Sequence, residues 1–430
     1  MRFSKVISLI SAICLSATSV LSGGTVGAVA QSKTHKIVDL IHSGKVKTFG
    51  RYREEDEKMT SYWSANGFEI NVKAKSATTL RVICSSNATV FLAAFVDGKQ
   101  QDRESAISPQ ITDLFVEIPK GEHTVRVLRD SPITNDAFAY FYFESIEFEG
   151  EILKANKNTD FYLEVIGDSI ACGNGSLGTF LKGQAWKNPD DHSAVKGFGY
   201  RIAEELGCDY SLVCRGGIGL LKDTSGSQEE QSVKTKVTMD EIYNLTNAYV
   251  DLNNNAEEYS FERKPNLILL ELGANDNAQF EDMWEPLLVD FIKQLRQKNG
   301  ENVPIVWVGK NLTHFSTVKR VIASTLSDDK NLYAFQFNYG GSGSAALSTQ
   351  TAGHPSSLEQ KAFANEIMRF LKRENLVPEK VTETKPEKNT ETNSTEKIPL
   401  KNVGLLAGGA AALGLVAGVA VSVFKRKKKK

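Results

Sequence analysis

Two residues far apart in the chain, Ser169 and His354, have the surroundings of a nucleophile and its base. A serine hydroxyl attacks a carbonyl at neutral pH only when a base lies within hydrogen-bond reach. Ser169 follows Gly167-Asp168 at the end of the apolar run 161–166, whose β-branched and aromatic residues are typical of a buried strand. A serine at the carboxyl end of such a strand is where an open α/β sheet exposes a nucleophile, although Gly-Asp-Ser also occurs in ordinary turns.

The chain has six histidines, and His354 is the one that we predict to act as the base. It stands in Gly353-His354-Pro355, directly before Ser356-x-x-Glu359, a pattern typical of the capping box that starts a helix. A loop held at the start of a helix would keep the imidazole fixed above the sheet. This is the geometry that a general base requires.

The other histidines are weaker candidates for the base. His314 follows the apolar run 304–308 and is the alternative that would also face the carboxyl edge of a sheet. His192 lies in a polar loop and is expected to be solvated. The remaining three precede residue 151, outside the predicted α/β part of the chain: His35, His42 and His123.

Two further apolar runs end in loops rich in small and polar residues. The run 210–214 is followed by Arg215-Gly216-Gly217, and the run 266–272 by Gly273-Ala274-Asn275-Asp276. Ser, Gly, Asn and His at strand ends, in this order, resemble the four blocks of the SGNH (GDSL-like) hydrolases. The chain resembles more closely carbohydrate esterase family 2, which places a small β-sandwich before its SGNH domain. The resemblance covers roughly residues 45–373.

The resemblance implies roles for the loops around the nucleophile. In SGNH enzymes three groups donate to the oxyanion, and here they map onto the Ser169 backbone N–H, the Gly217 backbone N–H and the Asn275 side chain. Gly216 competes with Gly217, since the glycine-rich loop can be aligned one position differently. The nearby acids Asp168 and Asp276 are expected to brace their turns.

One position departs from the resembled family. Many of its members carry Asp three residues before the histidine, where it orients the ring, and this chain has Thr351 there. Either a backbone carbonyl or another acid orients His354, or the chain is catalytically impaired. Because some members of the esterase family work with a Ser–His dyad, we interpret Thr351 as a variation.

The elements that would position these residues fall into two parts. Residues 45–150 show short alternating strands with turn signals, which predicts a β-sandwich, and the resemblance makes it a jelly roll. Residues 151–376 alternate apolar runs near 161–166, 210–214, 266–272, 304–308 and 332–337 with helical stretches near 198–206, 281–299, 316–326 and 356–373. Such alternation predicts parallel strands in a three-layer α/β sheet with ligands at the carboxyl ends of the strands, and the resemblance makes this domain flavodoxin-like.

The two ends of the chain predict where the protein resides. Residues 1–30 have the basic start, apolar stretch and Ala-x-Ala end of a secretory signal peptide, and 31–44 follow as a lead-in. Residues 377–402 have the composition of a disordered stalk, and 403–424 carry no charge over 22 residues, about 33 Å as a helix and long enough to span a membrane. The basic tail 425–430 would be cytoplasmic.

These ends predict a protein on the extracellular face of a Gram-positive-type cell, anchored by its C-terminal helix. The tail resembles a cell-wall sorting signal, but Ile398-Pro399-Leu400-Lys401-Asn402 stands where Leu-Pro-x-Thr-Gly is usual, so the membrane anchor is preferred to sortase attachment to the wall.

Composition narrows the partners. The 430 residues suffice for two domains with tails, and a formal net charge of −1 gives no indication of nucleic-acid binding. Four cysteines follow residue 30 in a compartment that permits disulfides, and Cys172 and Cys214 both lie near predicted strand ends, where they could be close in space. No Cys/His spacing suggests zinc, and we expect neither a metal nor a cofactor.

Three functions are consistent with these residues. The resemblance implies a serine esterase that removes O-acetyl groups from a polysaccharide such as xylan or glucomannan, through an acyl-enzyme on Ser169 with His354 as base. An esterase or acyltransferase acting on peptidoglycan or another acyl ester would use the same residues. A non-catalytic, glycan-binding surface protein is the third, and Thr351 is the feature that favours it.

Overall fold

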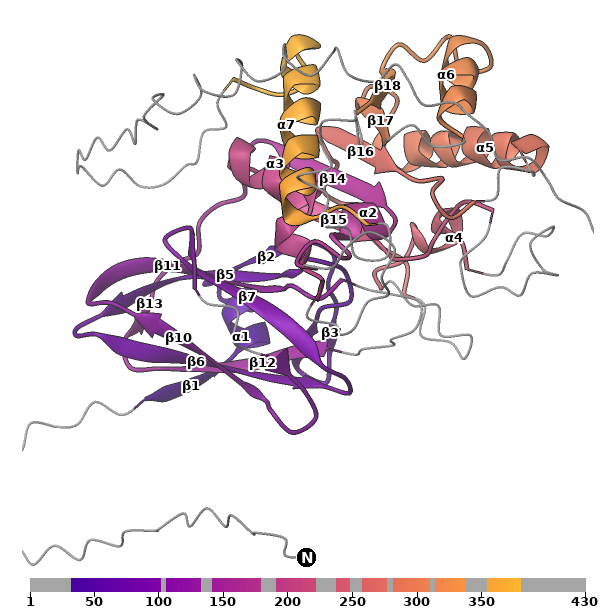
Figure 1. Ribbon diagram of the computed structural model, residues 1–430. Helices are drawn as coiled ribbons and strands as arrows, with labels where there is room; N and C mark the ends of the chain where they lie inside the picture. Colours follow the sequence, from indigo (N-terminus) through magenta and orange to yellow (C-terminus); the bar gives the residue numbers. More distant parts are fainter. Residues whose placement is uncertain are drawn as a thin grey trace, which may run out of the picture. The chain divides into compact units, whose positions relative to one another are not determined.

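The structure is a computed structural model that describes residues 32–101, 106–132, 141–178, 191–221, 237–247, 257–276, 281–309, 314–337 and 354–379 (Figure 1). All of these fall within one compact unit, Met1–Thr384. The predicted signal peptide 1–30, the stalk beyond residue 379, the apolar segment 403–424 and the basic tail 425–430 lie outside the described residues. None of the helices that the structure describes is long and apolar enough to cross a membrane.

Two antiparallel sheets form the predicted β-sandwich. The first has the order β10 (Asp113–Ile118), β6 (Thr78–Ser86), β12 (Phe141–Phe148), β4 (Lys58–Thr60) and β3 (Glu54–Glu55), with β1 (Lys33–Lys36) also paired to β12. The second has the order β13 (Glu151–Ile152), β5 (Gly67–Ala74), β11 (Gly121–Arg129), β7 (Val90–Val96) and β8 (Lys99–Gln100), with β2 (Val46–Phe49) on β5 and β9 (Ala106–Ile107) on β7.

The sandwich closes around side chains that alternate along its strands. In β10, Leu114, Val116 and Ile118 are buried while their neighbours are more exposed, as expected of a strand with one covered face. Phe68 of one sheet packs edge-to-face against Phe143 of the other, with ring centroids 5.1 Å apart. The core is therefore made by the inner faces of both sheets, which confirms the predicted sandwich.

The sandwich extends beyond the limits expected from sequence. The segment 31–44, expected to be a lead-in, supplies β1 and the helix α1 (Ile37–His42), whose Ile37 and Leu40 are buried in the sandwich core. At the other end, β13 pairs with β5 although it follows residue 150, the expected boundary. β1 was not predicted because its four residues, Lys-Thr-His-Lys, carry no apolar alternation.

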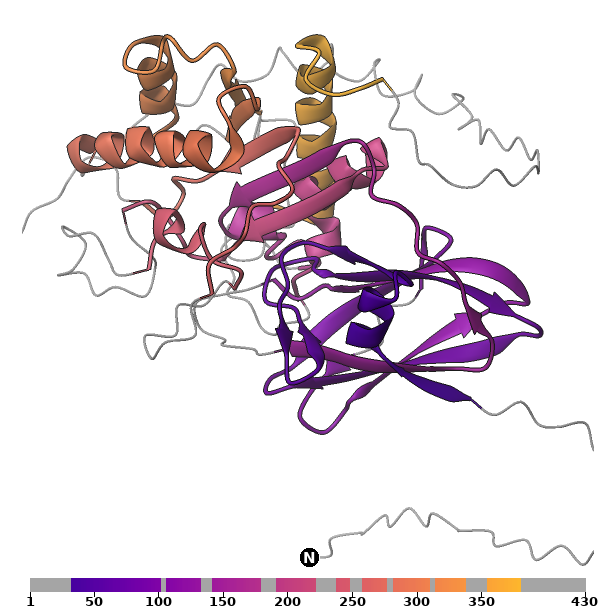
Figure 2. The same cartoon turned by 180° about the vertical axis from the view of Figure 1, so that it is seen from behind.

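The second part is a parallel sheet with the strand order β15 (Asp209–Cys214), β14 (Tyr162–Gly167), β16 (Leu267–Glu271), β17 (Ile305–Gly309) and β18 (Leu332–Gln336). In chain order this is 2-1-3-4-5, the flavodoxin-like arrangement that the sequence predicted. The helices are α2 (Ser169–Cys172), α3 (Phe198–Leu206), α4 (Met239–Ile242), α5 (Glu281–Asn299), α6 (Phe315–Ala323) and α7 (Ser357–Arg373), with a short 3-10 turn η2 (Ala194–Lys196). Figure 2 shows the same elements from behind.

Helices cover both faces of this sheet. Leu163 and Val165 of β14 share a buried cluster with apolar residues of α3 and α7, whereas Ile166 of the same strand shares another with α5 and α6. Successive residues of a strand point to opposite faces, so a strand covered on both sides is apolar throughout. All six residues of β14 are buried, which is why the sequence shows a continuous apolar run rather than an alternation.

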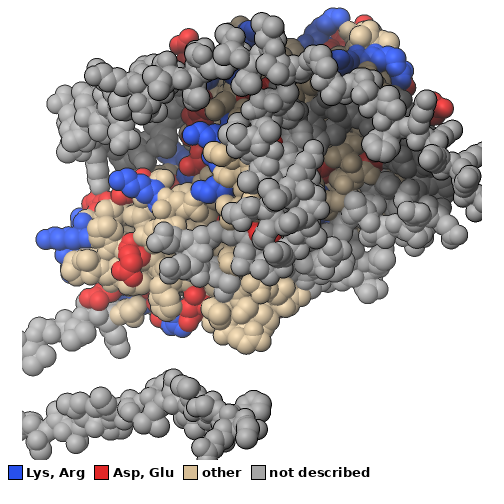
Figure 3. Space-filling model, in the orientation of Figure 1, with Lys and Arg blue, Asp and Glu red and all other residues tan. Residues whose placement is uncertain are grey.

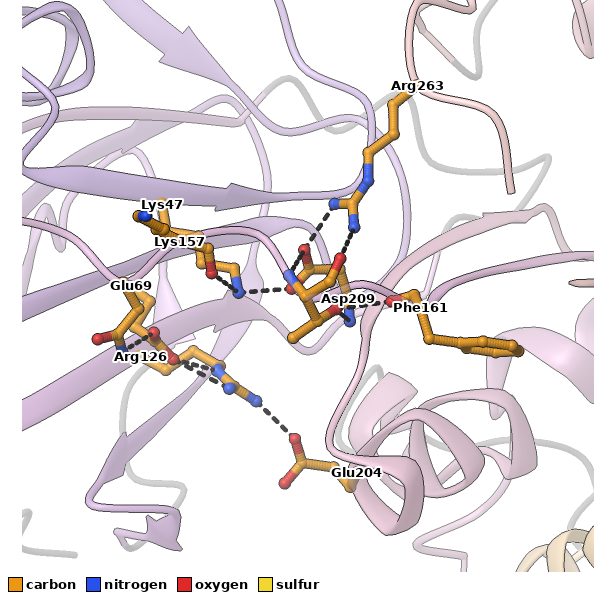
Figure 4. A network of polar contacts seen from close by, with 10 residues as sticks. Lys47, Glu69, Arg126, Lys157, Phe161, Glu204, Asp209 and Arg263 are labelled. Carbon is orange, nitrogen blue, oxygen red and sulfur yellow. Dashed lines mark hydrogen bonds and ion pairs between the residues drawn. The ribbon is translucent and has the colours of Figure 1, made fainter. Parts of the chain in front are cut away.

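Buried polar contacts join the sandwich to the edge strand β15 and its neighbour β14. Arg51, which follows β2, is 1% exposed and forms an ion pair with Glu164 of β14 at 3.0 Å. Figure 4 shows a second group, in which Lys47 of β2 lies 2.5 Å from Asp209 of β15, and Arg263 lies 2.6 Å from the same carboxylate. The sandwich therefore supports the strands that lead to the candidate site.

Candidate active site

The turn after β14 places Ser169 at the carboxyl edge of the sheet. Asp168 caps α2, because its Oδ1 accepts a hydrogen bond from the Ile170 backbone N–H at 2.9 Å. Only glycine fits at position 167, where a Cβ would lie 2.5 Å from the Cβ of Ala171 and 2.8 Å from the Glu271 carbonyl oxygen. Ser169 is thus the first residue of α2, and it remains 6% exposed.

His354 lies against this serine. Its Nε2 is 2.7 Å from the Ser169 Oγ, although 185 positions separate the two residues. The predicted capping box is present, since Ser356 Oγ accepts from the Glu359 N–H at 3.3 Å and the Glu359 carboxylate accepts from the Ser356 N–H at 2.9 Å. The start of α7 therefore holds the imidazole within the distance that a general base needs.

Gln360 fixes α7 relative to the nucleophile, and sequence reasoning missed it. Its Nε2 donates to the Ile170 carbonyl oxygen at 2.8 Å, and its Oε1 accepts from the Phe198 N–H at 2.9 Å, so one buried side chain joins α2, α3 and α7. A signal existed, because Gln360 occupies the helix face of the buried Phe363 and Ile367. A polar side chain in a core stripe indicates a specific partner.

The glycine loop after β15 presents Gly217 to the same edge. Gly217 has φ +81°, a left-handed conformation that glycine adopts without strain, and it is half-buried, whereas Gly216 is buried. Gly217 is thus the more accessible of the two glycines between which the sequence left the alignment open. The Ser169 N–H, at the first position of α2, is one of the groups that a helix leaves without an internal partner.

Asn275 joins the three loops. Its Nδ2 donates to the Ile218 carbonyl oxygen at 2.8 Å and, over a longer 3.3 Å, to Oδ2 of Asp168. Both amide hydrogens are therefore directed at protein acceptors. The bond to Asp168 is long for an N–H···O hydrogen bond, so it is the one that an oxyanion would replace.

Asp276 stabilises the glycine loop after β15 through hydrogen bonds. Its carboxylate accepts from the N–H groups of Leu220 at 3.1 Å and Leu221 at 2.9 Å, and from Nε1 of Trp284 at 2.7 Å. A Cβ at Gly219 would lie 2.2 Å from one oxygen of this carboxylate, so the loop needs glycine to approach it. Trp284, on the buried face of α5, is a second supporting residue that the sequence did not single out.

The two other histidines considered for the site, His314 and His192, are both buried. His314 is 1% exposed and stacks on Trp284 with ring centroids 4.4 Å apart, whereas the histidine that contacts the Ser169 hydroxyl is His354. His192 was expected to be solvated, which is wrong: it is 7% exposed, and its Nδ1 accepts from the Gly175 N–H at 2.8 Å. The ring satisfies a backbone donor of the turn after α2. Thr351 lies outside the described residues.

Cys172 and Cys214 lie next to each other behind the nucleophile, at the ends of α2 and β15, as the sequence suggested. Both are buried with free thiols. Burial raises the pKa of the Cys214 thiol well above its usual value, and the neighbouring Cys172 thiol raises it further. Among the described residues no group of three or more His, Cys, Asp or Glu side chains could hold a metal ion.

The strand order, the preceding sandwich and the Ser169–His354 contact together define a jelly roll followed by an SGNH-hydrolase fold. The structure is similar to a family two carbohydrate esterase from Clostridium thermocellum in complex with cellohexaose (TM-score 0.66, 21% identity, covering 77% of this chain and 99% of that one). It is similar to an acetyl xylan esterase from the rumen bacterium Butyrivibrio proteoclasticus (TM-score 0.66, 20% identity, covering 80% and 99%).

A third similar structure is a salicylyl-acyltransferase from a tetracycline biosynthetic pathway (TM-score 0.56, 14% identity, covering 80% and 99%). The sequence matches no protein-family model and no curated protein. These likenesses establish the fold and the resemblance to carbohydrate esterase family 2. The chemistry has to be argued from the site itself.

Proposed function

We propose that the protein is a serine esterase that removes O-acetyl groups from a polysaccharide. The observation that carries this proposal is the 2.7 Å contact between Ser169 Oγ and His354 Nε2 at the carboxyl edge of the sheet. A nucleophile with its base in reach, beside several N–H donors, is the arrangement that acyl transfer needs.

The steps follow from these positions. His354 Nε2 takes the Ser169 hydroxyl proton as the oxygen attacks the acetyl carbonyl, and the N–H groups of Ser169 and Gly217 stabilise the oxyanion that forms. Asn275 adds a third donor by exchanging its long bond to Asp168 for the oxyanion. His354 then protonates the departing sugar oxygen, and a water molecule, activated by the same ring, releases acetate from the acyl-enzyme.

Two lines of support point to a glycan at the cell surface. Similar structures are a carbohydrate esterase in complex with cellohexaose and an acetyl xylan esterase, which favours an acetylated polysaccharide such as xylan or glucomannan. The apolar segment 403–424 with the basic tail 425–430 supports anchoring in the membrane with the body outside the cell.

An acyltransferase is the second candidate. Its support is the likeness to a salicylyl-acyltransferase, and the acyl-enzyme would be the same in both reactions. The two differ in whether water or another hydroxyl accepts the acyl group. Peptidoglycan and other acyl esters are the alternative substrates.

The test is acetate release by the full-length protein from acetylated xylan, acetylated glucomannan and O-acetylated peptidoglycan. Ser169→Ala should abolish release, whereas the control Ser327→Ala, an exposed serine after α6, should leave it unchanged. Acetyl transfer to an added sugar without free acetate would favour the acyltransferase. No turnover of any polymer or of a small acetyl ester would overturn both enzymes and favour a glycan-binding protein.

A further inference from the structure

A cleft of about 270 Å³ lies between the sandwich and the helices α3 and α7. Phe95 and Gln100 line it from the sandwich, and Arg201 of α3 and Lys361 of α7 line it from the α/β part. None of the residues that line it belongs to the motif loops around Ser169. On the face shown in Figure 3, basic and acidic side chains are intermixed. The lining of the cleft is likewise mixed, with Lys196, Arg201 and Lys361 beside Glu204 and Glu205.

Each of the two acidic side chains that line the cleft already contacts a cation, although Arg126 is shared with Glu69. Glu204 lies 2.5 Å from the Arg126 guanidinium of β11, as Figure 4 shows, and Glu205 lies 2.9 Å from the Lys372 amine near the end of α7. Neither Arg126 nor Lys372 lines the cleft. Both carboxylates therefore have a cation partner on its outer side.

Arg201 has no such partner among the described residues. Its Nε donates to the Lys196 carbonyl oxygen at 2.9 Å, and its Nη2 donates to Ser357, at 2.7 Å to Oγ. These neutral acceptors orient the guanidinium without balancing its charge. Burial lowers the pKa of Arg201, because no carboxylate of a described residue offsets the loss of solvation.

Two lysines stand beside this guanidinium. Lys361 lines the cleft one turn into α7, is exposed, and forms no ion pair with a described residue. Lys196 reaches across to the sandwich, where its Nζ donates to Gln100 Oε1 at 2.7 Å. The cleft thus gathers three cationic side chains, the half-buried Arg201 and the two lysines, and each of its two acids contacts a cation that does not line it.

We propose that this cleft binds an oxyanion carried by the glycan substrate, either the carboxylate of a uronic acid or a phosphodiester. A planar guanidinium matches both groups and binds them with two parallel hydrogen bonds, while an ammonium adds a point charge. The assignment of the ligand to a glycan rests on the proposed function, whereas the preference for an oxyanion rests on the cleft alone.

The cleft also lies close to the catalytic histidine along the chain. Ser357, which accepts from Arg201, is three residues beyond His354, and its N–H donates to the Ser176 carbonyl oxygen at 2.7 Å in the loop after the nucleophile. These contacts link the cleft to the loops around Ser169, and in the proposed arrangement an acidic substituent of a neighbouring sugar lies against α3 and α7. The cleft would then select acidic polymers.

The test measures binding without turnover, by titration calorimetry on the full-length Ser169→Ala protein. The ligands are a xylo-oligosaccharide with a glucuronic acid side group, the same oligosaccharide without it, and a glycerol phosphate oligomer. We expect an acidic ligand to bind about tenfold more tightly than the neutral one. A preference for the uronate or for the phosphate oligomer would identify which source supplies the oxyanion. Equal affinity for all three would overturn the proposal.

Variants locate the effect. Arg201→Gln should remove most of the preference, and Lys361→Gln should reduce it about two- to fivefold, because the lysine is exposed. The control Arg369→Gln removes one positive charge from the same helix outside the cleft and should change nothing. An Arg369→Gln loss equal to that of Lys361→Gln would show attraction by net charge and contradict the cleft.

The outcome is independent of the proposed function. If the protein with Ser169 intact releases no acetate but the acidic preference persists and depends on Arg201, the esterase is wrong and the oxyanion site stands. If acetate is released and acidic and neutral ligands bind alike, the esterase stands and the oxyanion site is wrong. Thermal unfolding of Arg201→Gln shows whether the variant is folded, and Lys361→Gln tests the cleft without touching a buried residue.

Discussion

Buried carboxylates have different partners in two regions of the molecule. One is the carboxyl edge of the parallel sheet around Ser169, here called the catalytic edge, and the other is the contact of β14 and β15 with the sandwich, here called the junction. At the catalytic edge, Asp168 and Asp276 accept hydrogen bonds from backbone N–H groups, an amide and an indole. At the junction, Glu164 and Asp209 are paired with arginine and lysine side chains from the sandwich and a nearby loop. The same chemical group meets neutral donors in one place and cations in the other.

The difference reflects what each region has to do. Directional bonds from neutral donors align three loops to a narrow geometry. The junction has only to hold two layers together. Ion pairs are sufficient for that role. Close pairing and additional hydrogen bonds, such as the one from the Tyr243 hydroxyl to Glu164 at 2.7 Å, offset the cost of burying the charges.

The largest effect should come from the catalytic edge. His354→Ala removes the base, and kcat/KM for a small acetyl ester should fall by about 10⁴-fold or more, with little change in the free energy of unfolding because the ring is only half-buried. Added imidazole should restore part of the rate. Activity that stays within tenfold of the unchanged protein would show that another group takes the proton.

The junction should show the opposite pattern. Arg51→Met leaves Glu164 buried without its cation, and the free energy of unfolding in urea should fall by about 3–5 kcal/mol. The double variant Arg51→Met/Glu164→Gln should recover part of the loss, since no buried charge remains. The kcat of the protein that is still folded should change far less than in His354→Ala.

An exposed ion pair provides the matched control. Arg81 contacts Asp113 and Glu147, each at 2.9 Å, but its side chain is 36% exposed. Arg81→Met should therefore cost less than about 1 kcal/mol. Equal losses for Arg51→Met and Arg81→Met would contradict the role given to the buried junction.

Local signals explain which elements the sequence could predict. The helix α3 (Phe198–Leu206) begins and ends where predicted, because Gly197 and Gly207 flank a clear amphipathic run. The capping box of α7 and the alternation of strands and helices were likewise present as local patterns. These features depend on neighbours in the chain, which a single sequence contains.

Contacts between distant segments explain the rest. Arg51 donates to the carbonyl oxygen of Tyr243, 192 positions away, and nothing near Arg51 in the sequence indicates that partner. His192 was expected to be solvated because its neighbours in the sequence are polar, but its ring accepts a hydrogen bond from the Gly175 backbone N–H in the turn after α2. The Ser169–His354 contact was predictable only because four short motifs occur in a known order.

Within the catalytic edge, Asn275 should matter next most. Asn275→Ala removes an oxyanion donor and its bond to the Ile218 carbonyl oxygen, and kcat should fall by about 10²–10³-fold, with a smaller change in KM. Steady-state kinetics on a small acetyl ester measure both parameters. A rise in KM with kcat unchanged would mean that Asn275 binds substrate rather than the transition state.

Within the catalytic edge, the smallest effect is expected at Trp284, which is one step further from the serine. Trp284→Phe removes the indole N–H that donates to Asp276 at 2.7 Å, together with part of the ring volume, and leaves an aromatic ring beside His314. The free energy of unfolding should fall by about 1–2 kcal/mol, and kcat should fall severalfold because the glycine loop loses part of its support.

Trp307→Phe is the control for that change, since its ring is equally buried and lies 5.7 Å from Trp284, between centroids. The Trp307 side chain makes no hydrogen bond to a described residue, so its replacement tests packing alone. If both variants lose the same stability but only Trp284→Phe loses activity, the bond to Asp276 aligns the loop. If both lose activity alike, neutral donors at the catalytic edge stabilise the fold, as the ion pairs do at the junction, and do not position the site.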